Sequence, residues 1–305
     1  MDSKLKVVFI AGTGRCGSTI LDMVIGQIDS AISVGELRYL WKRGIGENRL
    51  LGTGEPFREN THWEKIIGEL YDVENLFTKA LEIEGLESSL RIREMLGVKT
   101  ESKICSLKDR VARYADELKK LLLSISNEFD SQFIVDSSKM PMHGFALAQI
   151  PNIDLRVIHL VRDRNAVVHS WGTSKFDKGK NGMMSTQSVW KASVEWVLIN
   201  RWIERYLGDG SVPYLKVSYT EFSSSPVLSI DKILKFIGED PANNPLEKNN
   251  SFNMLPTPSI SGNPSRFSTG RIVIKEDSRW LRDMSISKRI LSGIYGSIAN
   301  AMFFL

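Results

Sequence analysis

The sequence has little of what marks secreted, membrane-spanning or nucleic-acid-binding proteins. Its 305 residues include only two cysteines, Cys16 and Cys105, which excludes a disulfide scaffold and indicates a reducing compartment. It has no apolar run of about 18 residues, the length that a membrane-spanning helix needs, and residues 1–4 lead straight into a short apolar segment rather than a signal peptide. We therefore expect a cytoplasmic protein without a membrane span.

Charge of one sign is also scarce. The 40 lysines and arginines exceed the 36 aspartates and glutamates by only four, so the overall charge does not indicate a nucleic-acid partner. Any anion site must therefore come from a local cluster of basic side chains. The content of 42% hydrophobic and 25% charged residues is typical of a globular protein with a substantial core.

Short apolar segments predict the strands of a central sheet. They lie at residues 6–10, 31–35, 133–136, 155–161 and 214–218, and helical patterns separate most of them. This alternation indicates an α/β fold whose mostly parallel sheet is covered by helices on both faces, in three layers. Residues of about 56–130 carry helical spacing without a convincing strand, and we interpret them as a helical insertion in a single domain spanning 1–305.

Two further segments carry local predictions. Residues 176–182, with two glycines and two lysines among them, predict a mobile loop. Trp190, Trp196 and Trp202 lie in the helical pattern that follows, and we expect these side chains in the core.

A glycine-rich loop at residues 12–19 lies between the first predicted strand and a helix. Its glycines allow a tight turn, and the N-terminus of the helix adds partial positive charge, so the loop is suited to hold a phosphate. The spacing matches the nucleotide-binding pattern G-x-x-x-x-G-K-[ST] except that Ser18 replaces the lysine. That loss favours a donor with one 5′-phosphate over a triphosphate. The residues expected to contact the anion are Gly14, Arg15, Cys16, Gly17, Ser18 and Thr19.

Alternatives to this interpretation remain open. The loop is also compatible with an ordinary strand–turn–helix corner. A cysteine-phosphatase loop, C-x₅-R, is excluded because position 22 is Asp22 and not arginine. We expect Cys16 to contribute only its backbone N–H.

A second candidate anion site begins at Arg162, where the fourth predicted strand ends. Ser170 follows on the next helix, and a guanidinium with a nearby hydroxyl suits a second phosphate. Alternatively, Arg162 and Asp163 form an exposed ion pair of little consequence.

Together the two motifs resemble the sulfotransferases that use 3′-phosphoadenosine 5′-phosphosulfate (PAPS). The family's 5′ loop R-S-G-T-T/S is similar to residues 15–19, with Cys16 in place of serine. Its 3′-phosphate motif R-[DN]-P…S is similar to residues 162–170, with Arg164 in place of proline. Residues 136–141 and 262–280 add to the resemblance, which covers most of the chain outside the insertion. It is closest in style to tyrosylprotein and carbohydrate sulfotransferases.

The resemblance implies a P-loop-like fold and an activity. The chain is expected to transfer a sulfuryl group from PAPS to an acceptor hydroxyl on a carbohydrate, a tyrosine or a small molecule, by in-line displacement. No metal is expected, and the sequence has no cluster of ligands with metal-binding spacing. The sequence does not encode a recognisable acceptor or an oligomeric state.

Site residues also follow from the resemblance. Glu36 directly follows the second strand in a Gly-Glu context and is expected to be the catalytic base, with a helix-start carboxylate as the alternative. His143 is the second candidate for the base. Lys139 is expected to contact the transferred group, with a solvated surface lysine as the alternative, and Arg15 to share its charge. Arg266 and Arg271 are expected to close over the adenosine and its 3′-phosphate, Arg271 more closely.

Two other functions stay open. One is a P-loop nucleotide or small-molecule kinase, in which Asp136 after Val135 would hold a metal ion. The other is a nucleotide-binding module that has lost its base.

Overall fold

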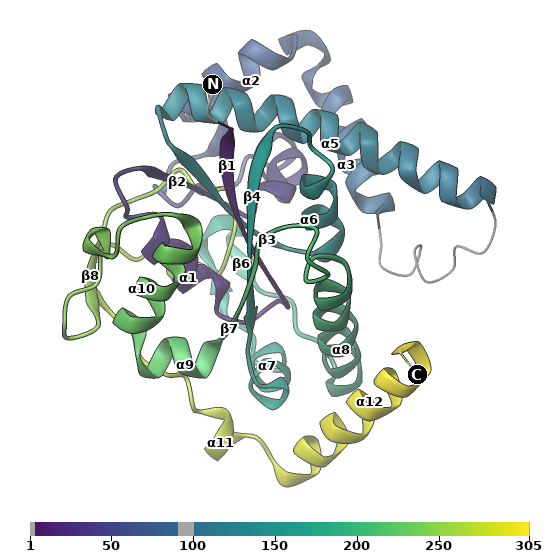
Figure 1. The fold of residues 1–305 in the computed structure, drawn as a ribbon, viewed down its shortest axis with the longest axis vertical. Helices are drawn as coiled ribbons and strands as arrows, with labels where there is room; N and C mark the ends of the chain where they lie inside the picture. Colours follow the sequence, from purple (N-terminus) through teal and green to yellow (C-terminus); the bar gives the residue numbers. More distant parts are fainter. Residues whose placement is uncertain (1–3, 91–100, 305) are drawn as a thin grey trace.

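The computed structural model describes residues 4–90 and 101–304, and its centre is a parallel sheet of five strands (Figure 1). The strand order is β2-β3-β1-β4-β7, and each neighbouring pair is parallel. The predicted mostly parallel α/β fold is confirmed, and each of the five predicted segments lies in one strand. The strands are β1 (Leu5–Gly12), β2 (Ala31–Gly35), β3 (Phe133–Lys139), β4 (Ile153–Val161) and β7 (Tyr214–Ser218).

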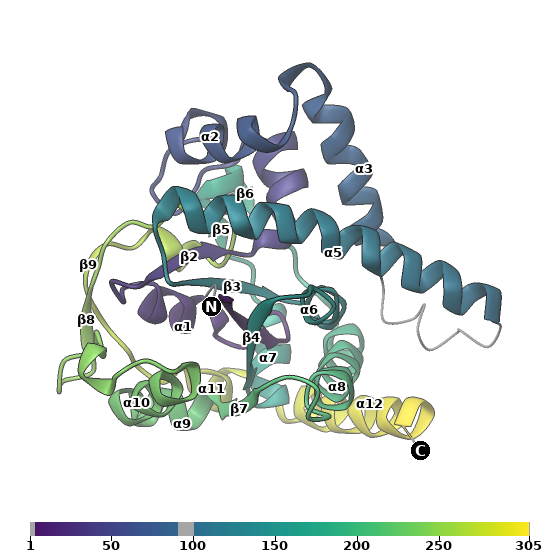
Figure 2. The ribbon, with the colours of Figure 1, turned by 45° about the horizontal axis from the view of Figure 1, so that its top comes forward.

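Helices cover both faces of this sheet, because side chains of a strand alternate between its two faces. Along β1, Val7 and Phe9 join one core cluster, whereas Val8 and Ile10 join the other. Figure 2 shows the helices of each cluster on opposite sides of the sheet. The first cluster packs against α5 (Glu101–Phe129), α6 (Pro141–Ala148) and α8 (Val189–Tyr206), and the second against α1 (Ser18–Ile25), α9 (Tyr219–Ser224) and α10 (Pro226–Ile237).

The segment between β2 and β3 is largely helical. It begins with the short helices η1 (Leu37–Tyr39) and η2 (Leu40–Gly46) and continues through α2 (Thr61–Leu70), α3 (Leu76–Ser89) and α5. α5 buries one apolar face, including Leu118, Leu121 and Leu122, against the sheet layer. Residues 91–100 of the predicted insertion lie outside the described residues. The assignment of 1–305 to one domain with an insertion stays a prediction.

Two small hairpins and the helices α7, α11 and α12 lie outside the elements named so far, together with the short helices η3 (Phe57–Glu59), η4 (Val73–Asn75), η6 (Pro241–Asn243) and η7 (Pro264–Phe267). The hairpins are β5 (Phe176–Asp177) with β6 (Gly182–Met183), and β8 (Ser251–Met254) with β9 (Gly270–Val273). The expected loop at residues 176–182 therefore contains a hairpin and the short helix η5 (Lys178–Lys180). α7 (Arg164–Trp171) follows β4, and α12 (Ile286–Phe304) lies along α8 after the short α11 (Trp280–Asp283) (Figures 1 and 2).

The chain between β8 and β9 passes back to the carboxyl edge of the sheet. Ile260 donates its backbone N–H to the carbonyl of Val34 at 3.0 Å, and Asn263 donates its N–H to the hydroxyl of Thr19 at 3.1 Å. This segment therefore forms a wall next to the ends of β1 and β2.

Two sequence expectations concern cysteines and membranes. Cys16 and Cys105 are both free thiols. In the part of the chain that the structure describes, no helix combines the length and apolar character needed to cross a membrane.

Asp22 in α1 makes stability depend on pH. It is 4% exposed, and Ser33 donates to its carboxylate at 3.0 Å. Burial raises the pKa of Asp22 to about 7, so between about pH 4 and 7 the folded chain keeps a proton that the unfolded chain has released. The contribution of this proton to stability is therefore complete at low pH and is lost as the pH rises through 7.

The variant Asp22→Asn is expected to remove this pH dependence. At pH 4 and below it melts close to the wild-type temperature. At pH 8 it is more stable by up to about 4 kcal/mol, which raises Tm by several degrees. Differential scanning calorimetry at both pH values measures the difference, with the exposed Asp29→Asn as a control that changes neither value. A variant that melts below wild type at pH 8 contradicts the assignment.

Candidate active site

A cavity of about 700 Å³ opens at the carboxyl ends of β1, β2, β3 and β4. Parallel sheets bring the residues that follow their strands to one edge, and ligands of open α/β folds bind there. The cavity therefore collects most of the predicted site residues from distant parts of the sequence. Those that line it are Gly14, Arg15, Gly17, Ser18, Thr19, Glu36, Lys139, His143, Arg162 and Ser170.

The glycine loop turns sharply into α1. Gly17 has φ 99°, and a Cβ there would come within 2.5 Å of the Tyr219 ring, so both backbone and packing require glycine. The Cys16 thiol is fully buried and does not line the cavity. The backbone N–H of Cys16 donates to the carbonyl of Thr13 at 3.3 Å, so its expected anion contact stays a prediction.

Arg15 extends from this loop into the cavity. Its guanidinium lies 4.9 Å from the centre of the Trp171 ring, and Nη1 contacts the Met184 sulfur at 3.3 Å. The Nη2 atom is buried and has no hydrogen-bond partner among the described residues. Burial lowers the pKa of Arg15, partly opposed by the charges of Glu36 and Asp177. The side chain is thus a half-buried cation with one buried, unpartnered donor atom among the described residues.

Glu36 and Lys139 form an ion pair inside the cavity. The Lys139 Nζ lies 2.7 Å from Glu36 Oε1, and the two side chains are only 12% and 11% exposed. Burial acts to raise the pKa of Glu36, but the charges of Lys139, Arg43 and Arg38 outweigh it and leave this pKa below its ordinary value. Glu36 is therefore a carboxylate at neutral pH, the form that accepts a proton.

A buried hydrogen-bond chain supports the turn that carries Lys139. His143 Nε2 lies 2.7 Å from Asp136, and its Nδ1 lies 2.9 Å from the Tyr114 hydroxyl. Asp136 also accepts from the Ser138 N–H at 2.8 Å. Burial acts to raise the pKa of Asp136, but His143 and Ser138 outweigh it and lower this pKa.

This series of hydrogen bonds helps to distinguish Glu36 from His143 as the catalytic base. Ser138 Oγ accepts the N–H of Arg38 at 3.0 Å, which ties the β3 turn to the segment after Glu36. Both residues line the cavity, but both ring nitrogens of His143 are engaged by buried partners, whereas Glu36 pairs there with Lys139. The geometry favours Glu36.

The second candidate anion site centres on Arg162, which is 7% exposed. Its Nη1 donates to the carbonyl of Arg15 at 3.2 Å, and the guanidinium lies 4.5 Å from the Tyr219 ring centre. Its Nη2 lies 3.2 Å from the Asp277 carboxylate, whereas its buried Nε has no partner in the described chain. The two anion motifs therefore meet in one cavity.

The structure does not contain the exposed ion pair between Arg162 and Asp163 that the sequence left open. Arg162 is buried and pairs with Asp277. Asp163 instead caps α7, accepting from the N–H groups of Asn165 and Ala166 at 2.8 and 3.1 Å. Arg164, which stands where the family has proline, donates to the hydroxyl of Ser292 in α12 and does not line the cavity.

Sequence reasoning missed Lys175 and Asp277, which also line the cavity. Burial and the charges of Arg279, Arg15 and Arg162 lower the pKa of Lys175, and only Asp277 opposes them. An anion bound beside Lys175 would offset the repulsion between these like charges. The only sequence signal was a basic residue in the loop after Ser170.

The two arginines of the closing segment lie outside the cavity lining. Arg266 is buried near Glu36, donating to the carbonyls of Gly262 at 2.9 Å and Leu50 at 3.3 Å. Arg271 is exposed on β9 and pairs with Glu247 at 3.2 Å. The structure therefore brings neither side chain to Arg162, and their adenosine contacts stay predictions.

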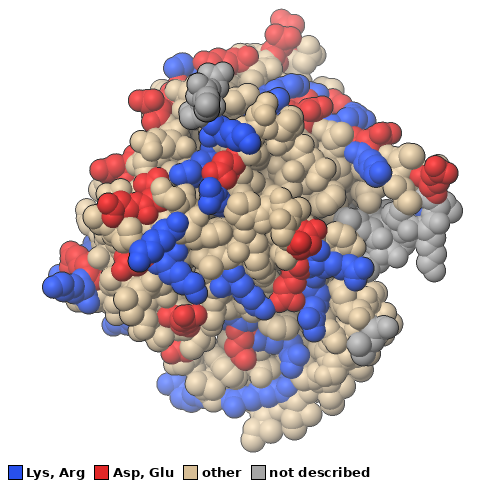
Figure 3. All heavy atoms as spheres, viewed as in Figure 1, with Lys and Arg blue, Asp and Glu red and all other residues tan. Residues whose placement is uncertain are grey.

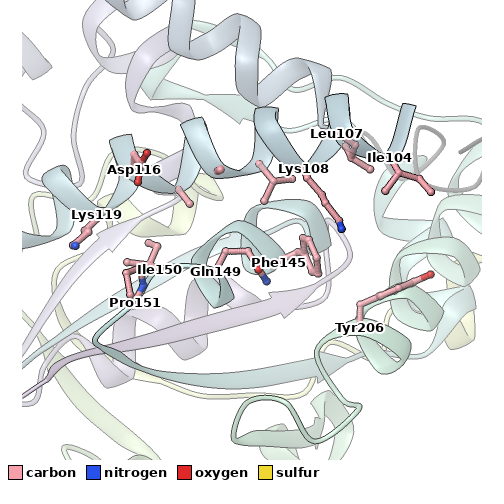
Figure 4. Close-up of a pocket in the computed structure, with 13 residues that line it drawn as sticks. Ile104, Leu107, Lys108, Asp116, Lys119, Phe145, Gln149, Ile150, Pro151 and Tyr206 are labelled. Carbon is pink, nitrogen blue, oxygen red and sulfur yellow. The ribbon is translucent and has the colours of Figure 1, made fainter. Parts of the chain in front are cut away.

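A second cavity, of about 600 Å³, lies between α5 and α6 (Figure 4). Ile104, Leu107 and Lys108 of α5 line it opposite Phe145 of α6 and Gln149, which follows α6. Residues 149–151 precede β4, which places this cavity at the amino ends of the strands. It holds none of the predicted site residues, and we assign it no part in the chemistry.

No metal cluster is apparent among residues 4–90 and 101–304, where no group of three His, Cys, Asp or Glu side chains is placed to hold an ion. The fold and the cavity thus define a P-loop-like α/β protein in which basic side chains surround a buried carboxylate. A family model described as "Sulfotransferase family" matches residues 7–242. The chain belongs to the sulfotransferase family. This membership supports the interpretation of the protein as a sulfotransferase enzyme.

Comparison with solved structures returned further sulfotransferases. The sulfotransferase domain from the Synechococcus PCC 7002 olefin synthase is 19% identical, with a TM-score of 0.45 over 97% of this chain and 96% of that one. The sulfotransferase domain from the curacin biosynthetic pathway is 13% identical, with a TM-score of 0.47 over 99% and 98%. No curated protein sequence gave a significant match.

Proposed function

We propose that this sulfotransferase moves a sulfuryl group from PAPS to an acceptor hydroxyl, with Glu36 as the base. The observation that carries the proposal is the Glu36–Lys139 ion pair, which shares one cavity with two arginines that each keep a buried unpartnered N–H. A carboxylate and a cation near two anion sites are the groups that sulfuryl transfer requires.

The residues present fit a donor with two anionic ends. Arg15 Nη2 and Arg162 Nε each lack a partner among the described residues, and an anion at each site would supply one. The loop residues 14–19 would hold the 5′ end, and Arg162, Ser170 and Lys175 the 3′-phosphate. PAPS supplies the activated sulfuryl group.

The chain's own residues then have distinct tasks. Glu36 accepts the proton of the acceptor hydroxyl, a general-base contribution of about 10²–10⁴-fold. Lys139 places positive charge beside the reacting group, where low solvent exposure strengthens its effect. The kinase alternative is weaker, because Asp136 is fully buried and bonded to His143 and Ser138.

The acceptor is expected on the Glu36 side of the cavity, where it is a carbohydrate, a tyrosine or a small molecule. Glu87, Leu90 and Tyr114, all from the helical segment between β2 and β3, line this side. Their place in the wall supports the single domain with an insertion of about 56–130. The two free cysteines support the proposed cytoplasmic location.

Nucleotide-dependent stabilisation tests the donor. The product nucleotide 3′-phosphoadenosine 5′-phosphate, at about 100 times its Kd, is expected to stabilise the protein by about 2.7 kcal/mol. A thermal-shift assay detects this as a rise in Tm of several degrees. Adenosine 5′-monophosphate, which lacks the 3′-phosphate, is the matched control and gives a smaller rise. Stabilisation by ATP with Mg²⁺ but not by the bisphosphate contradicts the proposal and favours a kinase.

A further inference from the structure

The C-terminal helix α12 presents its large apolar side chains to solvent. Its protein-facing side is built from small residues, among them the buried Ser292, Gly296 and Ala299, which pack on α7 and α8. In a surface helix, the large apolar side chains ordinarily face the core. Here large side chains with 48–73% exposure recur at every fourth position: Ile286, Ile290, Ile294, Ile298 and Met302.

The width of this face indicates a broad partner. Positions four apart advance about 40° around a helix, so the five side chains span about 160°. A single crossing helix packs along a narrower ridge. Leu291 of α12 and Leu281 of α11 are also exposed, at 40% and 56%. A flat apolar layer covers such a face better than one helix does.

The charge of α12 and its surroundings indicates which kind of partner would cover this apolar face. Residues 284–304 contain Lys288 and Arg289 but no aspartate or glutamate. On the preceding segment Arg279 and Arg282 pair with the neighbouring carboxylates of Asp277 and Asp283, so these four side chains add no net charge. In Figure 3 the surface over α12 is mostly uncharged, with basic side chains near its N-terminal end. A second copy would meet this basic surface with an identical one, whereas an anionic surface complements it.

We propose that α11 and α12 bind in the interface of an anionic lipid bilayer, with the isoleucine face toward the acyl chains. The exposed Lys288 then lies at the headgroups, next to Arg289, whose guanidinium donates to the carbonyls of Met284 and Trp280. The helix lies on the bilayer rather than across it. This surface is remote from the catalytic proposal, because its residues do not line the cavity that holds Glu36.

Vesicle sedimentation tests the proposal with the whole chain. Wild type is expected to sediment with vesicles of phosphatidylcholine and phosphatidylglycerol, and much less with phosphatidylcholine alone. The double variant Ile290→Glu with Ile294→Glu loses at least about tenfold in affinity for the vesicles, because two aliphatic side chains that would be buried in the bilayer become charged. Lys288→Glu weakens binding only to the anionic vesicles. The control Leu228→Glu changes an equally exposed residue of α10 and leaves binding unchanged.

Two outcomes overturn the proposal. One is a wild-type chain that does not sediment with anionic vesicles. The other is a dimer, seen by light scattering without lipid, that the double variant converts to monomer, which assigns the face to a second copy. All substituted side chains are exposed, and an unchanged Tm shows that each variant is folded.

Discussion

Replacing Glu36 by glutamine is expected to lower kcat by about 10²–10⁴-fold while leaving the Kd of 3′-phosphoadenosine 5′-phosphate near its wild-type value. Glutamine keeps an oxygen that accepts from Lys139, so the ion-pair geometry is largely retained, but an amide does not take a proton from the acceptor. Turnover with radiolabelled PAPS and a screen of hydroxylated acceptors measures the loss, and calorimetry measures nucleotide binding.

The control and the pH profile separate Glu36 from His143. Glu84→Gln changes an α3 carboxylate that pairs with Lys42 at 2.8 Å and is expected to keep full activity. Because Lys139 and the nearby arginines hold the pKa of Glu36 below its ordinary value, kcat/KM should stay high down to about pH 5. A loss of activity that begins well above pH 5 contradicts Glu36 as the base. Full activity of Glu36→Gln transfers the role to His143.

Replacing Arg162 by alanine is expected to weaken binding of 3′-phosphoadenosine 5′-phosphate by about 30–5,000-fold. Truncating one partner of a buried charged hydrogen bond costs about 2–5 kcal/mol, and Arg162 is buried with an unpartnered Nε. Adenosine 5′-monophosphate, without the 3′-phosphate, should lose little affinity. Isothermal titration of both nucleotides against wild type and variant gives the comparison.

Two further variants make this test sharper. Arg271→Ala removes an exposed arginine outside the cavity and should bind like wild type. Asp277→Asn should bind the bisphosphate more tightly, because it removes the carboxylate that competes for Arg162. Equal losses in the Arg162 and Arg271 variants, or weaker binding by Asp277→Asn, would assign the 3′-phosphate elsewhere.

The sheet was predictable because its strands are buried on both faces. A strand of this kind is a short continuous apolar run, and all five runs became strands. The site followed from the same logic, since Glu36, Lys139 and Arg162 each end or follow a strand and therefore meet at one edge.

Long-range partners and helix faces were less predictable. Asp277 lies 115 residues from Arg162, and no local pattern joins them. The prediction that all three tryptophans lie in the core was wrong for Trp190, which is 56% exposed, whereas Trp202 is 2% exposed. Positions six apart turn about 240° on a helix, so these three side chains cannot share a face. The small-residue face of α12 likewise gives no signal in a search for apolar periodicity.

Arg15 and Lys139 both adopt left-handed backbone conformations, with φ 69° and 67°. For residues with a Cβ this conformation costs roughly 1–2 kcal/mol, and glycine or asparagine would relieve part of it. Neither replacement carries a positive charge. At these two positions, substitutions that raise thermal stability would therefore lower turnover. In a thermostabilised form of this enzyme, the stabilising substitutions are expected at other positions of the chain.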